Sequence, residues 1–109
     1  MTKITIKKTD AGDYAGFTCE GHAGYAEKGE DIICAAISIL TINTVNSLDL
    51  LAKEPMETSE SEEQGFISAT FSQTPGEKGR LLMESYILGI SEIFNKYGKR
   101  YVCLEFKEI

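Results

Sequence analysis

The sequence is poor in residues that bind transition metals or form disulfides: it has one histidine, His22, and three cysteines, with no C-x-x-C pair. One histidine cannot supply a histidine-rich metal site, and the cysteine spacings match no common zinc template. An odd number of cysteines without paired spacing is typical of a reducing compartment, where thiols stay free. We therefore expect a cytoplasmic protein without metal or other cofactor. A zinc site built from the three thiols and His22 stays open as an alternative.

Long basic runs and long apolar runs are also missing. Lysine and arginine never form a run longer than a pair, and the net charge is −6. Gripping RNA or DNA requires a clustered basic face, so we expect no direct nucleic-acid partner; opposite charge would instead speed an encounter with a basic peptide. No apolar run approaches the roughly 20 residues that cross a bilayer, and the first residues alternate and turn like a strand rather than a signal peptide. We expect no membrane partner either.

What is present is a pattern of strands and helices for a single α+β domain over residues 1–109. Hydrophobic residues make up 42% of the chain, which is ordinary for a globular protein. We expect strands at 4–7, 14–21, 56–61, 64–72 and 101–107, and helices at 31–53 and 74–98. The order β-β-α-β-β-α-β implies a mostly antiparallel sheet packed by two helices.

The first predicted helix is apolar on two sides. Asp31 is placed to cap its start, because its side chain can accept a hydrogen bond from the free N–H groups of the first turn. One apolar stripe contains Ile33, Ala36, Ile37, Leu40, Leu48 and Leu51, and a second contains Ile32, Ala35, Ile39 and Ile42. The second stripe needs a cover beyond the sheet, either the other helix or a second copy of the protein. At the other helix, 74–77 has the spacing of a capping box that begins at Thr74.

Cys34 is the best candidate for a reactive residue. If Asp31 caps the helix, Cys34 lies in its first turn, where the partial positive charge of the helix N-terminus favours a thiolate. Neighbouring N–H groups can donate to the oxyanion of a tetrahedral intermediate. His22 precedes a glycine-rich loop that returns to the same helix start, so its imidazole can lie beside the thiol as an activating base. The charge of Asp31 opposes a thiolate unless it points at backbone amides or at His22.

Other interpretations of these residues stay open. A cysteine in an apolar helix is most often a small buried hydrophobe, and a lone loop histidine is usually a solvated group. Ser38 follows Cys34 by one turn, on the same helix face, and Tyr25 in the loop is placed to contact a substrate. Cys19 shares a strand face with a phenylalanine and is expected in the core. Cys103 is expected in the middle of the last strand.

The stretch 21–38, GHAGYAEKGEDIICAAIS, resembles the signature of the ribosomal-processing cysteine proteases, the Prp family. That signature has a Gly-His-Ala start followed at fixed distance by Gly-x-Asp-Ile-x-Cys-Ala-Ala-x-Ser. The resemblance implies a Cys–His dyad peptidase in which Cys34 is the nucleophile and His22 the general base. Gly21, Asp31 and Ser38 are motif neighbours. It also implies a homodimer that removes a short N-terminal extension from a large-subunit ribosomal protein, number twenty-seven.

Two further function classes compete with the protease. One is a non-catalytic ribosome-associated binding protein, which needs no reactive thiol. The other is a thiol redox protein in which Cys34 is oxidised and Cys19 or Cys103 resolves it. Rapid labelling of Cys34 alone below pH 7 would favour the protease over both.

Overall fold

The computed structural model describes residues 1–21, 28–61, 63, 65–97 and 100–109. Five strands and two helices follow one another in the predicted order. They are β1 (Thr2–Lys8), β2 (Tyr14–Glu20), α1 (Lys28–Leu50), β3 (Met56–Ser61), β4 (Phe66–Phe71), α2 (Glu77–Tyr97) and β5 (Val102–Glu108).

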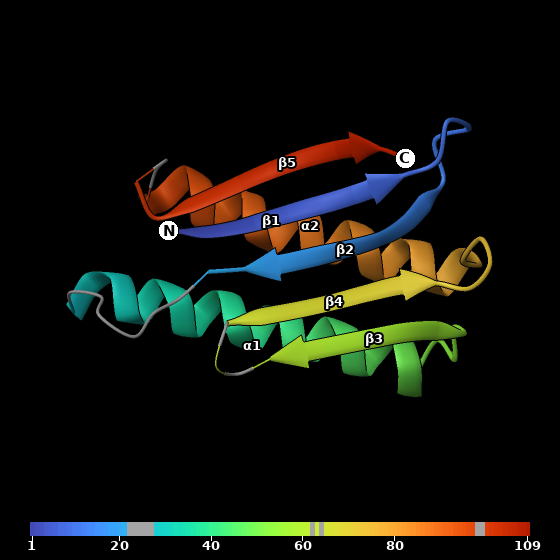
Figure 1. Cartoon of the computed structure of the whole chain (residues 1–109), viewed down its shortest axis with the longest axis horizontal. Coiled ribbons are helices and arrows are strands. Elements are labelled where there is room, and N and C mark those ends of the chain that lie inside the picture. The colour runs from blue at the N-terminus through green and yellow to red at the C-terminus, as the bar shows by residue number, and fades with distance from the viewer. Residues whose placement is uncertain (22–27, 62, 64, 98–99) are drawn as a thin grey trace.

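The strands form one sheet in the order β3-β4-β2-β1-β5. The β1–β2, β2–β4 and β3–β4 pairs are antiparallel, and only β5 runs parallel to its neighbour β1. Both helices lie on the same face of this sheet (Figure 1). The expected α+β layer, with a mostly antiparallel sheet packed by two helices, is therefore confirmed.

The core lies between the sheet and the helices. Alternate strand residues point toward the helices, as the period of two requires. The fully buried side chains include Ile4, Ile6, Phe17, Ile37, Leu48, Met83, Tyr86 and Ile90. The Tyr86 ring packs 4.8 Å from that of Phe17, between centroids, and the Tyr86 hydroxyl shares a buried 2.9 Å hydrogen bond with Thr41. This bond joins α2 to α1, so the two helices are held to each other as well as to the sheet.

Helix α1 begins earlier than the sequence predicts. It starts at Lys28, so Asp31 is its fourth residue, and the predicted N-cap role of Asp31 is wrong. Cys34 accordingly lies in the second turn and not the first. Lysine and glutamate are good helix formers, and one glycine costs only about 1 kcal/mol, so Gly29 does not stop the helix. At the other end α1 stops at Leu50, shortly before Lys53 takes a left-handed φ of 55°.

The second apolar stripe of α1 stays uncovered within one chain. Ile32, Ile39 and Ile42 are 66%, 69% and 43% exposed, and Ala35 is exposed too. The first stripe packs on the sheet through Ile33, Ile37 and Leu48 as predicted. Its other members behave differently: Leu40 is half-buried, and Ala36 and Leu51 are exposed. The helix therefore offers an apolar surface that its own sheet and α2 do not bury.

The same helix corrects the expectation about apolar runs. Its segment Ile32–Leu50 has a mean hydropathy of 1.5, which makes it long and apolar enough to cross a bilayer by length and composition alone. This apolar segment is not evident in the sequence because threonine, asparagine and serine interrupt the apolar residues. In the folded chain 33% of this segment is buried, and its buried side packs against the sheet.

Helix α2 is capped at Gly76, and Glu54, from outside the predicted box, binds its N-terminus. The helix begins at Glu77, and the Gly76 carbonyl accepts the 2.9 Å bond from Arg80 N–H, so Gly76 is the cap and the Thr74 prediction is wrong. The Gly76 N–H donates to Glu54 Oε2 at 2.8 Å. A carboxylate at the N-terminus of a helix is favoured by the helix dipole. Glu54 therefore provides the hydrogen-bond acceptor that the predicted capping box was expected to provide.

Candidate active site

The Cys34 thiol lies where three chain segments meet. It is on the second turn of α1, only 8% exposed, and its Sγ is 3.5 Å from Thr2 Oγ1 at the first residue of β1. Thr2 is equally buried, at 6% exposure. The end of β2 lies beside Thr2, because β1 and β2 pair antiparallel with Lys3 opposite Glu20, and Cys19 of β2 interacts electrostatically with Cys34. The hydroxyl was not identified from the sequence, since no local pattern marks residue 2 as close to residue 34.

Gly21, a motif residue of unassigned role, packs directly against Thr2. A Cβ at position 21 would lie 2.6 Å from Thr2 Cα and 2.9 Å from Thr2 Oγ1, closer than real Cβ atoms approach. The Gly21 N–H donates to the Gly65 carbonyl at 3.1 Å, which fixes this close approach. The absence of a side chain at Gly21 thus leaves the room that the Thr2 hydroxyl occupies beside Cys34.

The other predicted site residues are placed only in part. His22 and Tyr25 lie outside the described residues, and so does the side chain of Asp31, whose backbone is in α1. Ser38 is described and is exposed, whereas Cys34 is buried. Ser38 therefore faces solvent one turn after the thiol and does not share its buried surroundings. In the structure both Gly21 and Cys34 contact Thr2, and the contact between Cys34 and His22 stays a prediction.

Cys19 behaves as the core residue that the sequence predicts. It is 6% exposed on β2, and burial raises the pKa of its thiol. A hydrogen bond from Thr41 lowers this pKa, while the nearby Cys34 and Glu20 raise it further. Cys19 consequently stays a protonated thiol at neutral pH, which makes it a poor nucleophile.

The sheet register separates the cysteines that a zinc site would need. Cys103 lies opposite Lys3 on the β1–β5 pair, whereas Cys19 lies opposite Ile4, the next residue of β1. Neighbouring strand residues point to opposite faces, so Cys103 and Cys19 are on opposite sides of the sheet. Among the described residues no group of three histidine, cysteine or acidic side chains is close enough to hold a metal ion.

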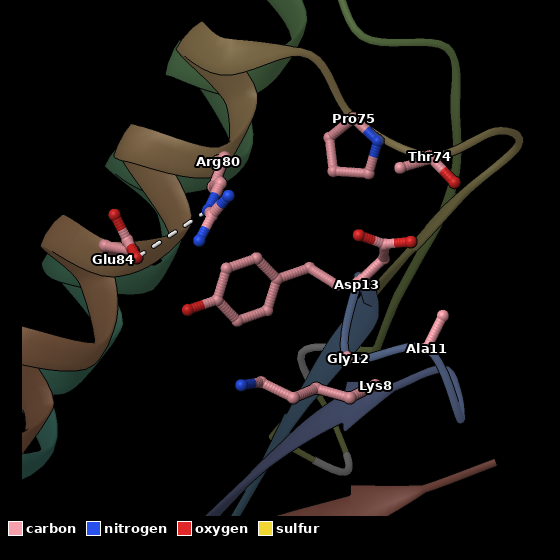
Figure 2. A pocket seen from close by; sticks show the side chains of 9 residues that line it. Lys8, Ala11, Gly12, Asp13, Thr74, Pro75, Arg80 and Glu84 are labelled. Atoms are coloured by element: carbon pink, nitrogen blue, oxygen red, sulfur yellow. Dashed lines mark ion pairs between the residues drawn. The ribbon is translucent and has the colours of Figure 1, made fainter.

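The pocket in Figure 2 is remote from this site. It has a volume of about 260 Å³ and is lined by charged residues of both signs, including Lys8, Asp13, Arg80 and Glu84. Lys8 ends the strand that Thr2 begins, so the pocket is roughly 20 Å from Cys34 at about 3.3 Å per residue. The pocket contains none of the predicted site residues and takes no part in the chemistry of Cys34.

The chain matches a known protein family and is similar to named proteins of that family. The family model described as Cysteine protease Prp matches residues 1–102. A Bacillus subtilis protein named ribosomal processing cysteine protease Prp is 27% identical over 101 residues, covering 89% of this chain and 90% of its own length. The Staphylococcus aureus protein of the same name is 23% identical over 99 residues, covering 91% of this chain and 93% of its own length.

Solved structures share the fold over nearly the full length. The crystal structure of Staphylococcus aureus Prp with a substrate peptide superposes with a TM-score of 0.89 at 22% identity, covering 97% of this chain and 99% of that one. A Streptococcus mutans protein superposes with a TM-score of 0.87 at 30% identity, covering 100% and 96%.

The buried Tyr86 and Cys19 predict a loss of stability at alkaline pH. Burial, the larger cause, and Cys19 raise the pKa of Tyr86, and burial raises that of Cys19. As the pH rises, the unfolded chain therefore loses these two protons before the folded chain does. The two groups contribute their full stability below their ordinary pKa values, 9.0 for Cys19 and 10.0 for Tyr86, and this contribution falls above those values. Urea unfolding between neutral and alkaline pH measures the effect.

The Tyr86→Phe variant separates this cause from general alkaline damage. It should lose about 1 kcal/mol at pH 7, because the buried hydrogen bond between Thr41 and Tyr86 is lost, yet its stability should fall less steeply with pH. The control is Tyr97→Phe, a ring that is 40% exposed, which should keep the wild-type slope. Equal slopes in wild type and Tyr86→Phe would contradict the assignment.

Proposed function

The chain belongs to the cysteine protease Prp family, and on this premise we propose that it is a cysteine endopeptidase that processes a ribosomal protein with Cys34 as nucleophile and His22 as base. The whole chain acts as one protease domain. The observation that carries the proposal is the position of Cys34, on the second turn of α1 and in contact with a buried hydroxyl that packs on the motif residue Gly21.

The proposed reaction has two stages. His22 accepts the Cys34 proton, and the thiolate attacks the carbonyl carbon of the scissile peptide bond. The imidazolium of His22 then protonates the departing amine, which leaves an acyl thioester on Cys34. In the second stage His22 takes a proton from water, the hydroxide attacks the thioester, and Cys34 leaves as the thiolate.

The supporting residues receive roles in keeping with their positions. Asp31 is inside α1 and not at its N-cap, so of its two predicted roles we propose the other, orientation of the His22 imidazolium. Ser38 faces solvent one turn after Cys34 and is proposed to contact the bound peptide. Tyr25, which precedes α1 in the sequence, is also proposed to contact the substrate.

The proposed substrate is the N-terminal extension of the large-subunit ribosomal protein number twenty-seven. The names of the Bacillus subtilis and Staphylococcus aureus relatives support ribosomal processing, and the Staphylococcus aureus structure was solved with a substrate peptide. The net charge of −6 favours encounter with a basic segment. Ribosome processing and free thiols both support a cytoplasmic location.

The redox alternative is weakened by the two other cysteines. A resolving cysteine must attack oxidised Cys34 as a thiolate, and burial keeps Cys19 protonated. Cys103 is on the opposite face of the sheet from Cys19 and from α1 (Figure 1), which carries Cys34. A binding protein without catalysis would share the fold, so cleavage itself must separate that alternative from the protease.

Cleavage of a synthetic peptide with the N-terminal sequence of the ribosomal protein tests the proposal. Wild type should release the extension, whereas Cys34→Ala and His22→Ala should each lose at least about a thousandfold in rate, because members of a catalytic unit fail together. Mass spectrometry of the products measures the rate and the cut bond. The matched control is Cys103→Ala, which should cleave like wild type; cleavage by Cys34→Ala at the wild-type rate would refute the assignment.

We also propose that the uncovered stripe of α1 is covered by a second copy of the chain. Three isoleucines of this stripe are 43–69% exposed in one chain, and burying apolar area of this kind drives association. The stripe begins two residues before Cys34, so a partner bound here would border the site.

The Ile39→Glu variant tests this dimer. Ile39 is 69% exposed, so a charge there should leave the chain folded but shift it from dimer to monomer in sedimentation equilibrium. Leu88→Glu is the control, because Leu88 is 63% exposed on α2 and outside the stripe. A wild-type chain that is monomeric at all concentrations, or an Ile39→Glu variant that still dimerises, would contradict the interface.

A further inference from the structure

We propose that the Thr2 hydroxyl donates a hydrogen bond to the Cys34 thiolate and stabilises the reactive form of the nucleophile. This inference rests on the proposed function and adds to it a residue outside the 21–38 motif. Thr2 Oγ1 is 3.5 Å from Cys34 Sγ, and both residues are less than 10% exposed. A contact with sulfur at this distance lies within hydrogen-bond range because of the large sulfur radius.

The chemistry of the two groups sets the direction of the bond. A hydroxyl is a good donor, while a thiol S–H is a weak one. Hydrogen bonds to an ionised acceptor are roughly twice as strong as neutral ones, so the bond strengthens when Cys34 loses its proton. Thr2 therefore favours the thiolate over the thiol, and it does so without carrying a charge into the buried junction.

The hydroxyl is held in place before any substrate arrives. The Thr2 N–H donates to the Tyr101 carbonyl at 3.0 Å, and Thr2 lies opposite Val102 in the parallel β1–β5 pair. Gly21 packs on its other side, with no Cβ to displace it. Threonine is branched at Cβ and has a restricted χ1, so a fixed backbone fixes Oγ1 as well. A donor fixed in this way costs no reorganisation when charge develops.

Titratable side chains lie on both strands beside the thiol. On β2, Cys19 interacts electrostatically with Cys34, and it stays protonated near neutral pH because burial raises its pKa. Glu20 follows it on the same strand and is exposed. On β1, Thr2 is uncharged, and its neighbour Lys3 pairs with Glu105 at 3.2 Å. The Thr2 hydroxyl is a described side chain that is placed to act directly on the Cys34 sulfur.

Replacement of Thr2 by valine and by serine tests the inference in the full chain. Valine keeps the shape and removes the donor, whereas serine keeps the donor. The readout is the rate of iodoacetamide alkylation of Cys34, followed by peptide mass mapping from about pH 5 to 9, the range in which a protein thiolate forms. We expect Thr2→Val to alkylate about tenfold more slowly at low pH and its half-maximal rate to move up by about one pH unit. Thr2→Ser should stay within about twofold of wild type.

Each other outcome overturns the inference. An unchanged pH profile in Thr2→Val means that the contact is packing alone, and a downward shift means that Cys34 donates to Thr2. A destabilised but still folded variant would lower the melting temperature without moving the pH midpoint, and this also counts against the bond. Because alkylation needs no peptide, a wild type that fails to cleave refutes the proposed function while leaving the Thr2 result to stand on its own.

Discussion

The arrangement of the site depends on one close approach, that of the Gly21 backbone to Thr2. The first residue of β1 and the residue after β2 can lie this close only because position 21 has no Cβ. The approach directs the Thr2 hydroxyl toward α1, where it meets the Cys34 sulfur. A backbone contact, rather than a charged pair, therefore holds together the described part of the site. This suits a buried position, where an unpaired charge would be costly.

The rest of the fold keeps that junction in place. Cys34 is fixed because α1 packs on the sheet through Ile33 and Ile37 and is tied to α2 by the Thr41–Tyr86 bond. Thr2 is fixed because β1 lies between β2 and β5. The parallel β5 is possible only because α2 carries the chain back across the sheet. The residue just before β5 thus contributes, through the Tyr101 carbonyl, to the position of Thr2.

The order of strands and helices and the fold class could be predicted because alternation and helical periodicity are local properties. The family motif in residues 21–38 is also local in the sequence, and it identified Cys34 and Gly21. The start of α1 was placed three residues late, because Gly29 was taken as a loop residue although the surrounding lysine and glutamates favour helix. Glu54 at the start of α2 and Thr2 beside Cys34 could not be predicted, since each contact joins residues 22 or more positions apart. Only the packed sheet defines such contacts.

Competitive alkylation of Cys34 and Cys103 in one molecule decides whether Cys34 is an activated nucleophile. Burial alone makes Cys34, at 8% exposure, the slower of the two, because Cys103 is partly exposed. If His22 activates Cys34, the wild-type protein below pH 7 should be modified at Cys34 well before Cys103. In His22→Ala, Cys103 should react first. If Cys103 reacts first in the wild-type protein, Cys34 is an ordinary buried thiol and not an activated nucleophile.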